Sequence, residues 1–421
     1  MAEEPGRSSL GNAGLVEEIQ GLYGPVFVSE LLIQRIWLRQ TLVPGPWRTA
    51  EGAELQVLHP GRWNRLAGPD FREARLAING RPVTGDVEVH FHERDWWAHG
   101  HAADPGFVGV VLHVVLFPGK GASDAGPQRV RTLRGLVPHS LVLLPLLSED
   151  LEQLASDDAL QCAGDRDGLV AMAALLALPL PERRAKLRAL AAQRWAARLR
   201  FTRRRVEREG FAEAAHQLLF EILGFRRNRA PMADLALACP HGSCRLDPGV
   251  LDPEARFAER RGDWTLAGLR PANHPRRRLA QARALYDRIP DWPDRLARLR
   301  LPPWLVSDRE QTPAARRRSH WSSWTETVRR DVFADTIGGT RWLTWLADGL
   351  LPLLAVREDA DATEAERAAG LWFHSQPGDI PDALKVFLAN SRITGDRQHP
   401  LTHGWLQGAL QGFLTDAFRG D

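Results

Sequence analysis

A strand with an unusual polar face constrains the fold of this chain most. In residues 85–92 (GDVEVHFH), polar and apolar residues alternate strictly, which is the two-residue period of a β-strand. The residues that share the polar face are Asp86, Glu88, His90 and His92. Carboxylates and imidazoles are ligands of divalent metals. The segment therefore predicts a strand whose polar face either binds a metal or is solvated.

The neighbouring segments predict the rest of a mixed sheet. Residues 54–58, 71–78 and 109–117 are strand candidates, and the last of these (GVVLHVVLF) has the apolar run of a strand buried on both faces. The Asn79-Gly80 pair predicts a hairpin turn. Residues 26–40 predict a helix with Ser29 as its N-cap, and residues 93–107 a short helix with a loop. The strand 85–92 is expected at the centre, between the strands 71–78 and 109–117.

The remainder of the chain predicts helices. Leu187, Ala191, Trp195 and Leu199 recur every four residues along segment 182–208, and residues 211–225 predict a second helix. We expect an α+β fold with a mobile tail over residues 1–25, an α/β domain over 26–150 and a mainly helical domain over 166–421. The polar stretch 157–167 is the expected boundary.

Charge and composition exclude several classes of protein. The chain has 55 basic and 52 acidic residues and a formal net charge of +3, so nucleic-acid binding would require a local basic surface. Three cysteines cannot form a disulfide framework. The longest apolar runs, 140–147 and 342–356, are shorter than the ~20 residues that span a bilayer. We expect a cytoplasmic protein without a membrane partner, and the sequence leaves its oligomeric state open.

Two acids on neighbouring strands indicate a metal site. Asp70 begins one strand and Glu88 lies in the middle of its hairpin partner, so both carboxylates can converge on one cation. Such a cation polarises a phosphoryl oxygen and activates a water. His90, two residues after Glu88, would face the same pocket. The expected ligands or their supporting residues are Asp70, Glu88, His92, Asp95 and His99.

The pair Pro69-Asp70 and the triplet Glu88-Val89-His90 resemble the signature of the PD-(D/E)xK nuclease superfamily. The resemblance implies a core of a helix, three strands, a helix and a strand, with Mg²⁺ or Mn²⁺ held by Asp70 and Glu88. It also implies hydrolysis of nucleic-acid phosphodiester bonds, with His90 as the water-activating group and Glu30 as a further acid. The superfamily has lysine where this chain has His90. Two alternatives therefore stay open: an inactive nuclease fold that binds nucleic acid or protein, and a different hydrolase that uses the histidines directly.

Four sequence blocks carry a second resemblance that covers more of the chain. They are GRWNRLAGPDFREARL, GDVEVHFHERDWWAHGHAADPGFVGVVLHVV, GFRRNRAPMADLA and GLRPANHPRRRLAQARAL. Their order and spacing are similar to those of an uncharacterised bacterial family, domain of unknown function 2851. This resemblance implies no function.

Arginines cluster in two segments beside predicted helices, where side chains and backbone N–H groups can reach phosphates. The candidate nucleic-acid-binding residues are Arg226, Arg227, Arg229, Arg270, Arg276, Arg277 and Arg278. The alternative is that these arginines pair with carboxylates of the protein itself.

Overall fold

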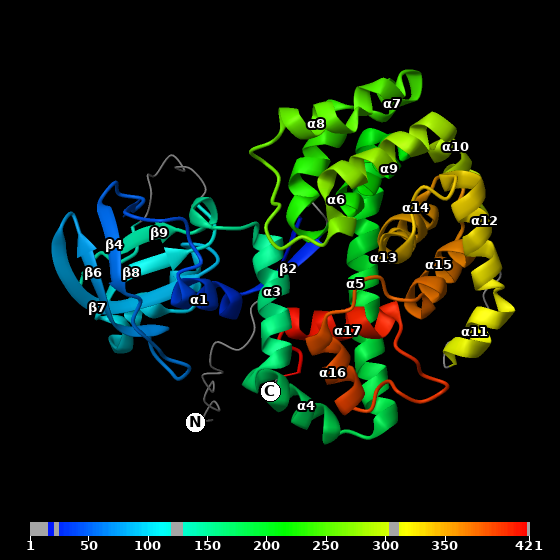
Figure 1. Cartoon of the computed structure of the whole chain (residues 1–421). Coiled ribbons are helices and arrows are strands. Elements are labelled where there is room, and N and C mark those ends of the chain that lie inside the picture. Colours follow the sequence, from blue (N-terminus) through cyan, green and yellow to red (C-terminus); the bar gives the residue numbers. More distant parts are fainter. Residues whose placement is uncertain (1–15, 21–24, 119–128, 303–310, 419–421) are drawn as a thin grey trace.

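The computed structural model describes residues 16–20, 25–118, 129–302 and 311–418. A mixed sheet forms from the N-terminal part, and helices form most of the remaining chain (Figure 1). The predicted α+β class is therefore confirmed.

The central position of the third predicted strand is also confirmed. The main sheet has the order β3-β4-β6-β7-β8-β9, with β5 paired to β6. β7 pairs antiparallel with β6 through the Asn79-Gly80 turn and parallel with β8. Positive φ angles of 49° and 75° at these two turn residues explain the Asn-Gly sequence. The strands are β3 (Trp47–Arg48), β4 (Glu54–His59), β5 (Arg62–Trp63), β6 (Phe71–Ile78), β7 (Arg81–His90), β8 (Val110–Val115) and β9 (His139–Val142).

The first predicted helix is shorter than expected. Residues 26–29 belong to β2 (Pro25–Ser29), which pairs antiparallel with β1 (Val16–Gln20). Part of the expected N-terminal tail is thus a strand, and the rest of that tail lies outside the described residues. Helix α1 (Glu30–Arg39) begins after Ser29, whose hydroxyl accepts a hydrogen bond from the Leu32 backbone N–H at 3.2 Å. Ser29 is therefore the N-cap, as predicted.

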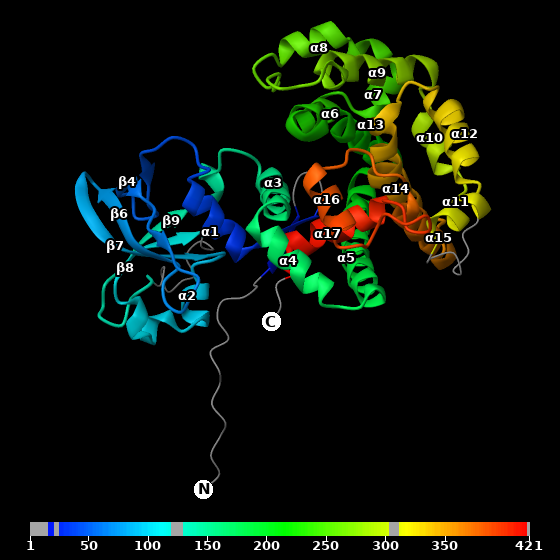
Figure 2. The same ribbon diagram turned by 60° about the horizontal axis from the view of Figure 1, so that its bottom comes forward.

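The two faces of β7 are both covered. Val87 and Val89 lie in a core shared with α1, whereas Glu88 and His90 face the segment after β7. That segment contains α2 (Asp95–Ala98) and the 3₁₀ turns η1 (His101–Ala103) and η2 (Pro105–Phe107). It runs along one side of the sheet before β8 begins (Figure 2). Glu88 and His90 of the polar face are therefore inside the protein, whereas Asp86 and His92 are half-buried.

Long helices dominate the rest of the chain. The predicted helices 182–208 and 211–225 lie within α5 and α6; α6 is interrupted at Phe225 and Asn228. The helices are α3 (Leu151–Gly164), α4 (Arg166–Leu176), α5 (Leu180–Glu209), α6 (Phe211–Ala238), α7 (His241–Leu246), α8 (Pro253–Glu259), α9 (Pro275–Arg288), α10 (Trp292–Ala297), α11 (Thr312–Arg318), α12 (Trp321–Phe333), α13 (Gly339–Thr344), the π-helical η7 (Trp345–Leu350), α14 (Leu351–Val356), α15 (Ala362–His374), α16 (Asp382–Asn390) and α17 (His403–Leu414). Further 3₁₀ turns in the described part of the chain are η3 (Leu144–Leu146), η4 (Pro248–Leu251) and η5 (Pro271–Asn273).

Two large hydrophobic cores, and a small cluster of Trp96, Phe107, Val110 and Val130, lie within the described residues. One extends from the sheet and α1 through α3 to α16 and α17, and the other lies among the helices from α5 to α15. The polar stretch 157–167 forms the second half of α3 and the start of α4, between the sheet and the helices (Figure 1). Among the described residues, no helix combines the length and the apolar character needed to cross a membrane.

Candidate functional site

The structure brings Asp70 and Glu88 together, as the sequence predicts. The Asp70 backbone N–H donates a hydrogen bond to Glu88 Oε2 at 3.0 Å, and the Val89 backbone N–H donates to Asp70 Oδ2 at 3.0 Å. Gln34 of α1 donates from Nε2 to Asp70 Oδ1 at 2.7 Å. Asp70 is 5% exposed and Glu88 is fully buried. These contacts fix the Asp70 carboxyl group and one oxygen of Glu88, and they leave Glu88 Oε1 for other partners.

The buried carboxyl groups do not share one protonation state. Burial, and then the charge of Glu88, raise the pKa of Asp70 well above its usual range. Burial opposes ionisation of Glu88 too, but the imidazoles of His101 and His90 outweigh it and lower the pKa of Glu88 to about 2. Burial also raises the pKa of Glu30 to about 8, with contributions from neighbouring carboxylates. Glu88 therefore carries the negative charge, because like charges this close do not all ionise.

Four histidines form one cluster beside the free oxygen of Glu88, and two of them contact it. His101 Nε2 lies 3.1 Å and His90 Nε2 lies 3.4 Å from Glu88 Oε1. His99 Nδ1 lies 3.1 Å from His90 Nε2, on the side away from the strand. The other nitrogen of His90, Nδ1, lies 2.8 Å from Nε2 of His113 on β8. The imidazoles of His90 and His101 thus contact Glu88, whereas His99 and His113 contact the two nitrogens of the His90 ring.

A glycine turn and two aromatic rings position His99 and His101. Gly100 has φ of 78°, a left-handed conformation that glycine adopts without strain. The turn lets the two flanking histidines face the same strand. Phe107 stacks on His101 with 3.8 Å between ring centroids, and the buried Trp96 contacts the rings of both His101 and His113. The segment after β7 therefore packs against these imidazoles and holds them in position.

The donor atoms fit a divalent metal ion. Three pairs of donor atoms lie 3.1–3.4 Å apart, namely Glu88 Oε1 with His101 Nε2, Glu88 Oε1 with His90 Nε2, and His90 Nε2 with His99 Nδ1, and ligands at about 2.0–2.2 Å around a tetrahedral ion lie roughly 3.3–3.6 Å apart. Among the described residues, His90, His99 and His101 form a group whose ligand atoms all lie within 4.8 Å of one another. Glu88 Oε1 and His101 Nε2 are buried without a well-formed hydrogen bond. An ion at this point would satisfy both atoms.

The remaining predicted ligands lie at the edge of this cluster or outside it. His92 comes after the end of β7; its Nε2 lies 3.3 Å from Glu17 Oε1 and its ring stacks on Phe117. Asp95 accepts a hydrogen bond from the His92 backbone N–H at 2.8 Å and so closes the turn into α2. The structure therefore brings together Asp70, Glu88, His90 and His99, and it gives His92 and Asp95 other partners.

Three residues of the site are not among the predicted ligands. His101 lies in the run HGHAADP, two residues after His99, and this proximity is the signal for it. His113 interrupts the apolar run of β8, and a single polar residue in a doubly buried strand is the corresponding signal. Gln34 has no comparable signal, because an isolated glutamine on an amphipathic helix is usually exposed.

The predicted nucleic-acid-binding arginines differ in exposure and in their partners. Arg226 and Arg229 lie at the interruption of α6 and line a cavity among the helices. Exposed Arg227 lies 3.5 Å from the Ala267 carbonyl oxygen, and Arg270 is exposed on a loop. The remaining three are on α9, which packs on α6 and α8. Arg276 pairs with Glu254, Arg277 is exposed, and buried Arg278 donates to Gln281 and Asn273.

Comparison with known proteins gives one result. Neither a search of curated proteins nor a search of solved structures found a match. The family described as "Protein of unknown function (DUF2851)" matches residues 30–246, which include the candidate metal ligands. Because the match covers more than half of the chain, this protein belongs to the DUF2851 family.

Proposed function

We propose that this protein is a metal-dependent hydrolase that cleaves phosphodiester bonds of nucleic acids. The observation that carries the proposal is one cluster of possible ligands, in which Glu88 Oε1 lies 3.1 Å from His101 Nε2 and 3.4 Å from His90 Nε2, and His99 Nδ1 lies 3.1 Å from His90 Nε2. These four side chains would hold the cation. A bound divalent cation supplies Lewis-acid polarisation of a phosphoryl oxygen and lowers the pKa of a water.

The kinds of ligand atom in the cluster indicate which metal ions it would bind. Imidazoles favour transition metals, whereas Mg²⁺ prefers carboxylate and water oxygens. Three imidazoles and one carboxylate therefore favour Mn²⁺ or Zn²⁺ over the Mg²⁺ that the sequence resemblance also allows. The hydrogen bond between His90 and His113 has the form of an outer contact that orients a metal-binding histidine.

The chain's own carboxyl groups have separate tasks in this proposal. Asp70 positions Glu88, because its backbone N–H holds Glu88 Oε2 and leaves Oε1 facing the imidazoles. Glu30, at the start of α1, has a pKa of about 8 and exchanges a proton near neutral pH. A carboxyl group with such a pKa suits general acid–base catalysis.

The substrate class rests on the order of elements and the positions of the acids. Helix α1, strands β4, β6 and β7, helix α2 and strand β8 come in the order implied by the nuclease resemblance. Pro69-Asp70 precedes β6, and Glu88-Val89-His90 ends β7. This agreement supports phosphodiesters of nucleic acids as the substrate.

One observation favours a second candidate, a binding module without catalytic activity. Glu88 and His90 are fully buried, and within the four-residue donor set only His99 is half-buried instead of buried. A substrate would have to approach past His99. If this approach stays closed, the metal stabilises the fold and takes no part in a reaction.

Cleavage assays with matched variants test the proposal. The protein is stripped with EDTA, Mn²⁺, Zn²⁺ or Mg²⁺ is restored, and labelled single-stranded and duplex DNA and RNA are the substrates. We expect cleavage by the wild type with Mn²⁺ or Zn²⁺. Glu88→Gln and His99→Gln should lower the rate by at least about 10- to 100-fold, the usual cost of disturbing such a site.

His92→Gln is the matched control. It removes a histidine two residues from His90 whose ring contacts Glu17 and Phe117, so activity should stay within about twofold of wild type, since uncoupled substitutions have small effects. Binding of metal without cleavage of any of the four substrates would overturn the catalytic proposal and leave the binding module. Loss of activity in His92→Gln equal to that in His99→Gln would overturn the assigned ligand set.

A further inference from the structure

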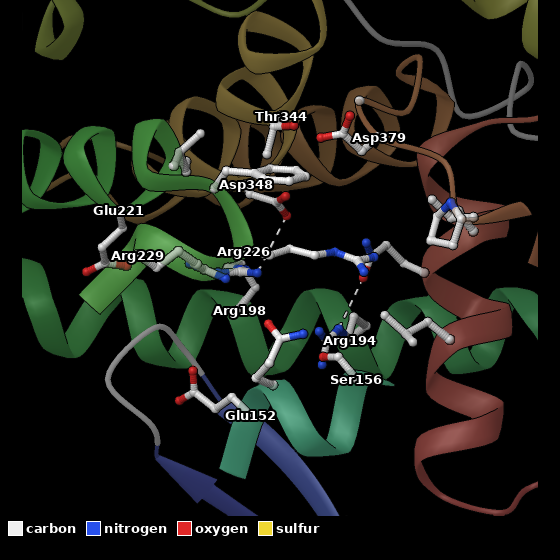
Figure 3. A pocket seen from close by; sticks show the side chains of 18 of the residues that line it. Glu152, Ser156, Arg194, Arg198, Glu221, Arg226, Arg229, Thr344, Asp348 and Asp379 are labelled. Atoms are coloured by element: carbon white, nitrogen blue, oxygen red, sulfur yellow. Dashed lines mark hydrogen bonds and ion pairs between the residues drawn. The ribbon is translucent and has the colours of Figure 1, made fainter. Parts of the chain in front are cut away.

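A cavity among the helices has the composition of a binding site. It has a volume of about 260 Å³ and lies between α5, α6, α13, η7 and α17, near the start of α3. This volume is just below the ~300–1,000 Å³ range of small-molecule sites. Figure 3 shows the side chains of Arg194, Arg198, Arg226 and Arg229 gathered in its interior. It belongs to the helical part, whereas the histidine cluster lies on the sheet.

Two of the arginines that line the cavity are held in an unfavourable electrostatic environment. Burial, and then the neighbouring Arg198, lower the pKa of Arg194 to about 10. Burial also lowers the pKa of Arg341 to about 10, and Arg278, Arg229 and Arg226 add to this effect. A guanidinium group normally has a pKa above 12. Bringing an anion into the cavity would relieve both groups.

The hydrogen bonds of the cavity lining leave donors available. Arg194 donates from Nε to Gln407 Oε1 at 3.1 Å, so its partner is a neutral amide and not a carboxylate. Arg341 is 4% exposed, and its Nε atom has no hydrogen-bond partner. His403 is also 4% exposed and lines the cavity; its Nε2 atom lies 3.7 Å from Asp348, too far for a hydrogen bond. Buried donors without acceptors are costly, so an acceptor that enters the cavity would be stabilised by them.

Carboxylates line the cavity too, and most of them have cationic partners. Asp348 lies 3.5 Å from Arg198, Asp379 pairs with Arg341, and Glu221 pairs with Arg205 at 2.6 Å. Asp150 and Glu152 line the end nearest α3. The carboxylates therefore hold particular arginines in place, and none of the described acids lies within ion-pair distance of Arg194 in this structure.

We propose that this cavity binds the phosphate group of a small phosphorylated molecule. Guanidinium groups approach it from α5, α6 and α13, and several donors from different directions match a tetrahedral oxyanion better than a planar carboxylate, which one arginine can bind bidentately. The site is independent of the proposed hydrolase centre, because none of the metal ligands lines it.

Calorimetry with the full chain in EDTA tests this proposal without involving the metal site. The probes are inorganic phosphate, adenosine 5′-monophosphate, adenosine and citrate. Adenosine monophosphate or phosphate should bind, and adenosine and citrate should not. Arg194→Gln should weaken binding by about tenfold or more, because a charged hydrogen bond is lost. Arg203→Gln, an exposed residue of the same helix, should bind like wild type.

Further variants separate the outcomes. Arg226 lies at the partly exposed side of the cavity, and Arg226→Gln should also weaken phosphate binding. It is the replacement test if Arg194→Gln fails to fold. His101→Ala should bind phosphate normally, so failure of the hydrolase proposal would leave this result unchanged. No binding of phosphate or adenosine monophosphate by wild type would overturn the proposal. Equal binding by wild type and Arg194→Gln, or preference for citrate, would do so as well.

Discussion

A buried ion pair connects α1, the helix that carries Glu30 and Gln34, to α3. Arg35 of α1 donates from Nη1 to Asp158 of α3 at 2.6 Å, and its Nη2 lies 2.8 Å from Asp167. The side chains of Arg35 and Asp158 are only 5% and 8% exposed. Replacing Asp158 with alanine would leave the buried guanidinium with one carboxylate instead of two.

The burial of this ion pair determines how much unfolding free energy Asp158→Ala should lose. Breaking a buried ion pair by removing one partner costs about 3–5 kcal/mol. Because Asp167 remains, we expect Asp158→Ala to lower the free energy of unfolding by the lower figure, about 3 kcal/mol. The urea dependence grows with chain length, so for a chain of this size it is at least about 3 kcal/mol/M, and the unfolding midpoint would fall by roughly 1 M or less. Tryptophan fluorescence reports the transition, since Trp37 of α1 is fully buried.

The exposed pair of Arg283 and Asp287 provides the control. Its Nε–Oδ1 distance is 2.9 Å, but the side chains are 31% and 45% exposed. Asp287→Ala should therefore change the free energy of unfolding by less than about 0.5 kcal/mol. A loss below about 1 kcal/mol in Asp158→Ala, or an equal loss in both variants, would refute the reasoning that burial makes the first pair strong.

Three further predictions concern other parts of the molecule. Burial lowers the pKa of His216 from 6.5 to about 3, so its stabilising contribution is present above pH 6.5 and is lost as pH falls. His216→Asn should flatten the dependence of the unfolding free energy on pH by about 1.4 kcal/mol per pH unit between roughly pH 6 and 4. The same pH dependence of the urea midpoint in wild type and His216→Asn would contradict this. Gly408→Ala places a Cβ atom 2.3 Å from a carbonyl oxygen of α5 and should cost about 1–3 kcal/mol in urea unfolding, whereas Gly242→Ala, with open space around it, should not. His113→Ala removes the partner of His90 and should weaken Mn²⁺ binding by about 10- to 100-fold in calorimetry, and an unchanged affinity would exclude an orienting role.

Local sequence patterns determine the sheet well. Strict alternation in residues 85–92, the apolar run 109–117 and the Asn79-Gly80 turn each report a backbone period or a turn geometry, and the structure has a strand or a turn at each, although β7 ends at His90. The expected start of the first helix is too early. Val26 and Val28 belong to β2, which pairs antiparallel with β1, a segment within the expected N-terminal tail.

The candidate site is only partly predictable from the sequence, because part of it is assembled by contacts that local patterns do not encode. Asp70, Glu88 and His90 belong to adjacent strands, so the register of a hairpin brings them together. His101 and His113 reach the cluster through a glycine turn and through the parallel pairing of β7 with β8. Both depend on tertiary packing. His92 lies beyond the end of β7, where the alternation of the strand no longer sets its direction.

A crystal of the protein soaked in Mn²⁺ and measured at the manganese absorption edge tests the central claim most directly. The claim is that Glu88, His90, His99 and His101 hold a divalent cation. We predict one anomalous peak enclosed by Glu88 Oε1, His90 Nε2, His99 Nδ1 and His101 Nε2. The absence of a peak there, or a peak held by Asp70 with the imidazoles unengaged, would contradict the account.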